Sequence, residues 1–171
     1  AAFALLDCFN LDLSAQVAAV KAFKGLPHRM QTVRQLNGVV WVNDSKATNV
    51  GADVSALTSI DKPIVWIAGG DSKGADFSEF ADVMSSQIVL LIALGRDADK
   101  IVSVVEKKVA TTRVQSMREA VQVAYDKASD ADVVLLSPAC ASFDMYRNYE
   151  ERGEDFAACV LALPTDRGVK S

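Results

Sequence analysis

Residues 64–76 read Ile64-Val65-Trp66-Ile67-Ala68-Gly69-Gly70-Asp71-Ser72-Lys73-Gly74-Ala75-Asp76, an unbroken apolar run followed by a glycine-rich polar loop. A run that is apolar at every position predicts a strand buried on both faces, because a half-exposed strand would alternate. The two consecutive glycines allow the chain to turn sharply where this strand ends. Two further apolar runs, Gln87–Leu94 and Val133–Leu136, predict strands in the same way, and a weaker short strand is predicted at Ala110–Val114.

Amphipathic stretches separate these runs and predict helices. The clearest begins at Met117 and ends at Lys127, with Ser116 and Glu119 forming a capping box at its start. One face of it carries Met117, Ala120, Val121, Ala124 and Tyr125. A last helix from about Glu150 to Leu163 is expected to stop at Pro164. We expect it to bury Phe156, Val160 and Leu161.

The chain reaches the sheet through a predicted β-hairpin. Asn37-Gly38 separates the β-prone segments Met30–Leu36 and Val39–Val42, and this dipeptide suits a turn in which both central residues have positive φ. Before it, the first two dozen residues read as helix, notably Leu13 to Phe23, with Gly25 as the stop signal. The fold class is therefore α/β: a Rossmann-like, open, mostly parallel sheet with helices on both faces, entered through a β-hairpin.

Composition excludes several classes of function. A net charge of −4 without a dense Lys/Arg stretch argues against a nucleic-acid binder. No apolar run approaches the roughly 18 residues of a membrane span, and no signal peptide is evident. Three widely spaced cysteines indicate reduced thiols in the cytoplasm. His28 is the only histidine and has no suitable partners nearby in sequence, which disfavours a zinc site or a serine triad.

Polar clusters follow three of the predicted strands. They are Asn43-Asp44-Ser45-Lys46-Ala47-Thr48-Asn49, residues 69–77, and Ser137-Pro138-Ala139-Cys140-Ala141-Ser142-Phe143-Asp144. In open α/β sheets the ligand lies outside the carboxyl ends of the strands. We therefore expect these three loops to share one edge of the sheet and to form the site.

Together with Gly25-Leu26-Pro27-His28-Arg29, these loops closely resemble the Mur ligase family, and within it the D-glutamate-adding branch. The resemblance covers about residues 25–158. It implies that residues 25–171 are the C-terminal, amino-acid-binding domain, with residues 165–171 frayed. Residues 1–24 would then be a helical remnant of the central ATP-binding domain, or a linker. The family's P-loop, G-x-x-x-x-G-K-[ST], is absent from this sequence, so we expect the chain alone to be inactive.

The resemblance implies an enzyme that adds D-glutamate to UDP-N-acetylmuramoyl-L-alanine through an acyl-phosphate, in peptidoglycan synthesis. D-Glutamate carries two carboxylates and an amine that must be free to attack, so its site needs cations or hydroxyl donors for both anionic ends. By resemblance, Thr48 and Lys73 hold the substrate near its α-carboxylate. Ser142, Phe143 and Tyr149 surround the side-chain carboxylate.

A second group of residues resembles the family's nucleotide site. The aspartate that matches Asp44 reaches the ATP ribose when the domains close. Arg29 and Lys46 resemble residues that meet phosphate, and Lys46 is assigned a catalytic role because positive groups spread the charge that develops during transfer. The full-length enzyme is expected to use ATP and Mg2+, with no metal ligands assigned in this chain and no chemistry assigned to His28.

Each of these residues also has a structural interpretation. Asp44 and Ser45 could cap a helix or form a turn, and Lys73 could be a solvated loop lysine. Arg29 could be an ordinary surface residue, and Phe143 and Tyr149 could belong to the core. Cys140 is read as a small buried hydrophobe.

Two other classes of protein stay open at this point. One is a stand-alone Rossmann-like module that binds a small anion. The other is a ligase of the same superfamily, such as a folylpolyglutamate-type enzyme, although relatives adding other amino acids usually carry an Asp-Tyr-Ala-His type sequence where this chain has Asp44-Ser45-Lys46-Ala47. In the main interpretation the partners are D-glutamate, ATP, UDP-N-acetylmuramoyl-L-alanine and the missing N-terminal and central domains. The enzyme is expected to be a cytoplasmic monomer.

Overall fold

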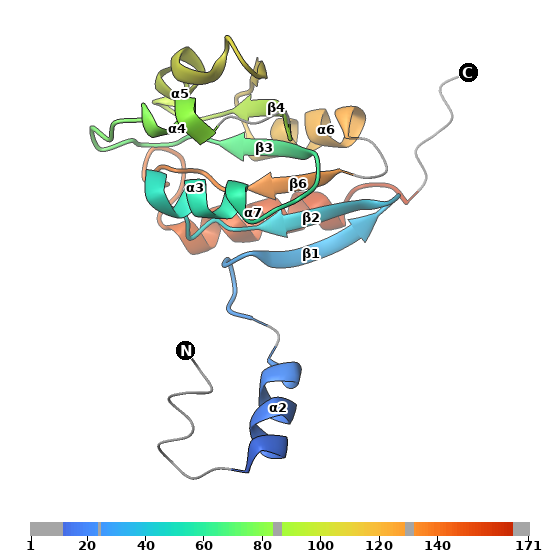
Figure 1. The fold of residues 1–171 in the computed structure, drawn as a ribbon. Helices are drawn as coiled ribbons and strands as arrows, with labels where there is room; N and C mark the ends of the chain where they lie inside the picture. The colour runs from blue at the N-terminus through green and yellow to red at the C-terminus, as the bar shows by residue number, and fades with distance from the viewer. Residues whose placement is uncertain (1–11, 24, 84–86, 129–131, 166–171) are drawn as a thin grey trace.

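The computed structural model describes residues 12–23, 25–83, 87–128 and 132–165 (Figure 1). Six strands form one sheet in the order β1-β2-β6-β3-β4-β5. The strands are β1 (Gln31–Leu36), β2 (Val39–Asn43), β3 (Ile64–Ala68), β4 (Ile88–Ala93), β5 (Ala110–Arg113) and β6 (Val133–Leu136). Only the β1–β2 pair is antiparallel, and every other neighbouring pair in the sheet is parallel. The predicted fold class is confirmed.

Helices cover both faces of the sheet. The first face is packed by α3 (Val50–Thr58), α4 (Glu79–Val83) and α5 (Ala98–Val105), the second by α6 (Met117–Lys127) and α7 (Tyr149–Leu161). The central strands β3 and β6 are buried at every position, as their unbroken apolar sequences predict. A remaining helix, α2 (Leu13–Ala22), lies apart from the sheet in Figure 1.

Local sequence signals fix several elements. Asn37 and Gly38 have φ of 50° and 81°, the positive values that a tight hairpin turn requires. Helix α6 begins and ends where the capping box and periodicity predict. Its capping is not fully reciprocal, because Ser116 Oγ accepts from Glu119 N whereas Glu119 Oε2 accepts from Gln115 N.

Two helix ends differ from the prediction. α2 ends at Ala22, one residue before the predicted end, because Phe23 is already extended; Gly25 follows the helix, as expected of a stop signal. α7 ends at Leu161, whose side chain is 61% exposed, and the prediction that Leu161 is buried is wrong. The buried stripe of α7 runs from Phe156 to Val160 and on to Leu163, at helical spacing, and Leu161 lies one residue off that stripe. The predicted helix before residue 12 and the predicted frayed end from residue 166 lie outside the described residues.

Candidate functional site

The carboxyl ends of the central strands are level with one another. Asn43 of β2 pairs with Leu136 of β6, and Leu136 pairs with Ile67 of β3. The chain leaves β2 and β3 toward the first face of the sheet, but leaves β6 toward α7 on the second face. The loop after β6 therefore diverges from the loops on both sides of it, which opens a crevice between them. Such a reversal is where ligands bind in open α/β sheets.

One cavity at this crevice contains all five residues assigned to D-glutamate. It has a volume of about 310 Å³, at the lower end of the usual range for small-molecule sites. Its lining consists of Thr48, Lys73, Ala141, Ser142, Phe143, Asn148, Tyr149 and Glu150. We call it the amino-acid cavity. Residues from three parts of the chain, 48, 73 and 141–150, thus meet in one place.

Lys73 has a constrained position in this cavity. Its φ is 49°, a left-handed conformation that a residue with a Cβ seldom adopts. Its backbone N–H donates to Asp71 Oδ1 at 3.0 Å. Its ammonium lies 4.9 Å from the centre of the Phe143 ring, and Phe143 is exposed. Phe143 is therefore no core residue; its ring stands at the cavity beside the cation.

A second cavity, also about 310 Å³, contains all three residues assigned to the nucleotide. We call it the nucleotide-side cavity. It is lined by Arg29, Met30, Asp44, Lys46, Ala47, Ala52, Ser55, Ala56 and Ser59. Asp44 Oδ1 accepts from Met30 N at 3.1 Å. Burial raises the pKa of Asp44, while the Met30 amide and the charge of Arg29 act in the opposite direction.

Lys46 connects the two cavities. It lines the nucleotide-side cavity, yet its Nζ lies 3.7 Å from the centre of the ring of Tyr149, which lines the amino-acid cavity. A cation this close to an aromatic face is attracted by the ring. Lys46 is therefore the one predicted residue that the structure places against both cavities.

Asp44 and Ser45 do not cap a helix, but they do form a turn, in which Ala47 N donates to Asp44 O at 2.9 Å. The helix-cap interpretation is therefore wrong and the turn interpretation is confirmed. The N-cap of α3 is Asn49, whose side chain accepts from Ala52 N. Ser45 Oγ donates to Tyr149 O at 2.8 Å. The first loop is thus hydrogen-bonded to the start of α7, across the crevice.

Sequence reasoning missed Arg152. Its side chain is buried and donates from Nε to Ser45 Oγ at 2.9 Å, from Nη2 to Ser45 O at 2.8 Å and from Nη1 to Cys140 O at 3.0 Å. It therefore ties α7 to the loops after β2 and β6 together. The signal was present, because Arg152 precedes Phe156 and Val160 at four-residue spacing and so occupies a core position of the last helix.

His28 also has a structural role. Its φ is 60°, and its Nδ1 lies 3.1 Å from Asn43 Nδ2, which also donates to Gly153 O at 2.9 Å. A Cβ on Gly153 would stand 2.2 Å from His28 Nδ1. Gly153 is therefore required for the close packing of α7 against this corner. Cys140 is buried, as predicted.

Another cavity, of about 410 Å³, contains none of the predicted residues. It lies beside the ends of β4 and β5 and includes Arg96 and Arg113. Arg96 pairs with Asp71 and Arg113 with Asp99, so the positive charges of this cavity are balanced and point to no ligand class.

Among the described residues, no group of three or more His, Cys, Asp or Glu side chains could hold a metal ion. None of the described helices is both long and apolar enough to cross a membrane.

These features define an open α/β domain with two neighbouring cavities, each lined in part by charged and hydroxyl side chains, at a reversal of its strand order. The family described as Mur ligase, glutamate ligase domain, matches residues 28–140. The chain belongs to this family.

Curated relatives include UDP-N-acetylmuramoylalanine--D-glutamate ligases. The protein of that name from Methylococcus capsulatus is 48% identical over 163 residues, which are 95% of this chain and 36% of the relative. The one from Teredinibacter turnerae is 46% identical over 166 residues, 95% of this chain and 37% of the relative. The chain thus spans little more than a third of the length of these relatives.

Solved structures share the fold at low sequence identity. The UDP-N-acetylmuramate-alanine ligase MurC from Thermotoga maritima superposes with a TM-score of 0.64 at 15% identity, over 91% of this chain and 35% of that one. A bifunctional folylpolyglutamate synthase/dihydrofolate synthase from Yersinia pestis, complexed with AMPPNP and Mn ion, gives 0.57 at 19% identity, over 78% and 31%.

Proposed function

We propose that this chain is the D-glutamate-binding, C-terminal domain of an ATP-dependent ligase that joins D-glutamate to UDP-N-acetylmuramoyl-L-alanine. The observation that carries the proposal is the amino-acid cavity, in which Thr48, Lys73 and Ser142 present one cation and two hydroxyls from three separate loops. A small dianion needs donors at both ends, and a single loop could not reach both. The names of the curated relatives support the same reading.

In this proposal Lys73 and Thr48 hold the α-carboxylate, and Ser142, Phe143 and Tyr149 surround the side-chain carboxylate. The amine of D-glutamate then faces the crevice, where Lys46 lies between the two cavities. ATP transfers its terminal phosphoryl group to the carboxylate of the partner substrate, giving an acyl-phosphate and ADP. The amine then attacks the carbonyl carbon, inorganic phosphate leaves, and the nitrogen loses a proton as the amide forms. Positive groups at this position stabilise the transferring phosphate and the charge on the carbonyl oxygen.

The nucleotide-side cavity suits the polar parts of ATP. Asp44 is a carboxylate that can accept from ribose hydroxyls, and Arg29 and Lys46 are cations that can contact phosphate. With no metal ligands assigned in this chain, Mg2+ would be held mainly by ATP and by the missing domains. We further infer that residues 1–24 belong to the preceding domain or a linker, that the intact enzyme is a cytoplasmic monomer, and that the chain alone turns over no ATP.

The test is steady-state kinetics of the full-length protein with ATP, D-glutamate and UDP-N-acetylmuramoyl-L-alanine varied in turn. Lys73→Ala should raise KM for D-glutamate or lower turnover by a combined factor of at least about thirty, equivalent to about 2 kcal/mol or more, because a buried carboxylate loses its cation. Asp44→Ala should instead raise KM for ATP about tenfold or more, through one lost charged hydrogen bond. Near-normal efficiency of Lys73→Ala with D-glutamate would place the amino acid elsewhere.

The rival interpretation is a stand-alone module that binds a small anion without chemistry. Calorimetric titration of the 171-residue chain with mononucleotides and with D-glutamate separates the two. Tight binding of a mononucleotide by this chain alone would favour the module, since the proposed ligase needs its central domain to close over ATP.

A further inference from the structure

The loop that carries Lys73 closes in a tight turn. Lys73 and Gly74 both have positive φ, of 49° and 79°, and Ala75 N donates to Ser72 O at 2.9 Å across them. These bonds lie within the loop, so they fix its local shape but not its position relative to the rest of the domain. A neighbouring group outside the turn should therefore determine where Lys73 stands.

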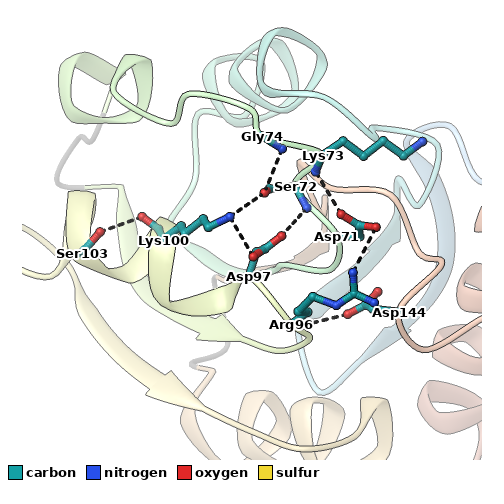
Figure 2. A network of polar contacts seen from close by, with 9 residues as sticks. All are labelled: Asp71, Ser72, Lys73, Gly74, Arg96, Asp97, Lys100, Ser103 and Asp144. Atoms are coloured by element: carbon teal, nitrogen blue, oxygen red, sulfur yellow. Dashed lines mark hydrogen bonds and ion pairs between the residues drawn. The ribbon is translucent and has the colours of Figure 1, made fainter.

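Asp97 is that neighbour. It occupies the N-cap of α5, where an aspartate ordinarily accepts a hydrogen bond from its own helix, but its carboxylate makes no such capping bond. Instead Asp97 Oδ2 accepts from Ser72 N at 2.8 Å, as Figure 2 shows. Asp97 N also donates to Gly70 O at 3.0 Å. The Asp97 side chain therefore bonds to the loop at Ser72, one residue before Lys73, and not to the N-terminus of its own helix.

Lys100 completes the contact. Its Nζ lies 2.9 Å from Asp97 Oδ1 and donates to Ser72 Oγ at 3.2 Å, and the same Oγ accepts from Gly74 N at 3.3 Å (Figure 2). Asp97 and Lys100 thus both hold Ser72, and Ser72 is in turn bonded to Gly74 on the other side of Lys73. The backbone of Lys73 is therefore anchored through Ser72.

A solvated surface ion pair would be the ordinary alternative, and such pairs contribute little. Here the two partners differ: the Asp97 side chain is only 14% exposed, against 55% for Lys100. The bond from Lys100 and then the Ser72 amide hold the pKa of Asp97 at about 2. Asp97 is therefore ionised throughout the neutral range. The neutral group that donates to the Asp97 carboxylate is the backbone amide of Ser72 in the loop, rather than solvent.

The second anchor of the loop lies on its other side. Asp71 forms an isolated antiparallel bridge with Ala141, next to Ser142, through backbone hydrogen bonds of 2.9 Å and 3.0 Å, and its side chain accepts from Lys73 N. Its ion pair with Arg96 is long, at 3.5 Å, and the arginine is 63% exposed. The bridge fixes the loop on the side facing Ser142, which leaves Asp97 to fix the opposite side.

We infer that Asp97 is a positioning residue that places the Lys73 ammonium in the amino-acid cavity and so sets affinity for the amino-acid substrate. The inference rests on the proposed function of Lys73. It assigns Asp97 no contact with substrate. Its effect should therefore pass entirely through Lys73 and leave the nucleotide side unchanged.

The test uses Asp97→Asn and Asp97→Ser in the full-length ligase. Asn and Ser are N-caps about as good as Asp, so a residue that merely caps α5 would tolerate both changes. A positioning residue would not tolerate them: KM for D-glutamate should rise about tenfold while KM for ATP stays within about twofold.

Lys100→Met, at an exposed position, should change KM for D-glutamate in the same direction but less. The matched control is Asp99→Asn, in the first turn of the same helix, where the carboxylate is 78% exposed and pairs with Arg113; it should leave both constants unchanged.

A double-mutant cycle gives the decisive readout. If Asp97 acts through Lys73, then Asp97→Asn adds little to the loss already caused by Lys73→Ala, because residues of one hydrogen-bond network do not contribute additively. Full additivity, equal shifts in the two KM values, or an unchanged KM for D-glutamate would each overturn the inference.

Amide hydrogen exchange separates this inference from the proposed function. Asp97→Asn should speed exchange in residues 71–75 and leave residues 43–49 as in the wild type, whether or not the enzyme uses D-glutamate. Unchanged exchange at 71–75 would overturn the positioning role by itself. A wild-type enzyme that makes no product from D-glutamate would instead overturn the proposed function. Should Asp97→Asn fail to fold, the exchange and kinetics of Lys100→Met decide in its place.

Discussion

Replacing Arg152 with methionine measures how strongly α7 holds the two loops of the crevice. The guanidinium donates three hydrogen bonds, of 2.9 Å and 2.8 Å to Ser45 and 3.0 Å to Cys140 O. Bonds from a charged donor contribute about 1.5–3 kcal/mol each, so the three together are worth roughly 4–9 kcal/mol.

The opposing contribution is the cost of burying the charge. Burial lowers the pKa of Arg152 to about 10, against an ordinary value of about 12.5 for arginine. At about 1.4 kcal/mol per pKa unit the cost is roughly 3 kcal/mol. The hydrogen bonds outweigh it, and Arg152→Met should lower the free energy of unfolding by about 1–6 kcal/mol. Because each kcal/mol shifts Tm by about 2–4 °C in a domain of this length, Tm should fall by more than about 2 °C.

Thermal unfolding of the 171-residue chain, followed by circular dichroism, provides the measurement. The matched control is Arg147→Met at the start of the same helical segment, because Arg147 is 86% exposed and pairs with Glu151 at 3.1 Å. An exposed pair is worth at most about 1 kcal/mol. If the two variants melt within about 2 °C of each other, the buried bonds of Arg152 merely offset its burial and the reasoning fails.

Two further changes test buried features of the same region. Burial raises the pKa of Asp53 well above its usual range. Ser137 is the side chain that most opposes this rise, but its hydroxyl lies outside hydrogen-bonding geometry. A carboxyl group whose pKa is raised in the folded state contributes stability that is lost as the pH rises. The Tm advantage of Asp53→Asn over the wild type should therefore grow from pH 4 to pH 8, and an advantage that stays constant over this range would contradict this. A Cβ on Gly70 would meet Ala141 O at 2.3 Å, whereas one on Gly74 would meet nothing within 4 Å, although both glycines have positive φ. Gly70→Ala should accordingly cost more than Gly74→Ala, which pays only the left-handed strain of about 1–2 kcal/mol, and equal melting temperatures would refute the close approach.

The elements that could be predicted from the sequence are those determined by residues close to one another along the chain. The hairpin turn needs two positive φ values, which Asn37 and Gly38 supply, and the buried strand β3 is apolar at each of its positions. Hydrophobic periodicity likewise determined α6. Parallel strands separated by helices then placed the polar loops at one edge of the sheet, because each loop follows the carboxyl end of a strand.

The strand order could not be derived in this way. β6 is the last strand in the chain, yet it lies between β2 and β3. Its position depends on contacts between segments about 70 to 90 residues apart, such as Leu136 with Ile67 and with Asn43. No local pattern of β6 distinguishes a central place from an edge place, since its four apolar residues suit any fully buried strand.

This long-range insertion explains why the cavities form where they do. If β6 were at the edge of the sheet, Ser142 and Lys73 would follow strands that are not neighbours, and their loops could not share a lining. With β6 between β2 and β3, the loop 137–144 lies against the first loop on one side and the Lys73 loop on the other. Arg152 links it to the first through Ser45, and the Asp71–Ala141 bridge links it to the second. Both contacts join residues from different segments of the chain, so no local sequence motif predicts them. We therefore expect changes at Arg152 to disturb the first loop and changes at Asp97 to disturb the Lys73 loop, and each can be measured while the other loop serves as the internal control.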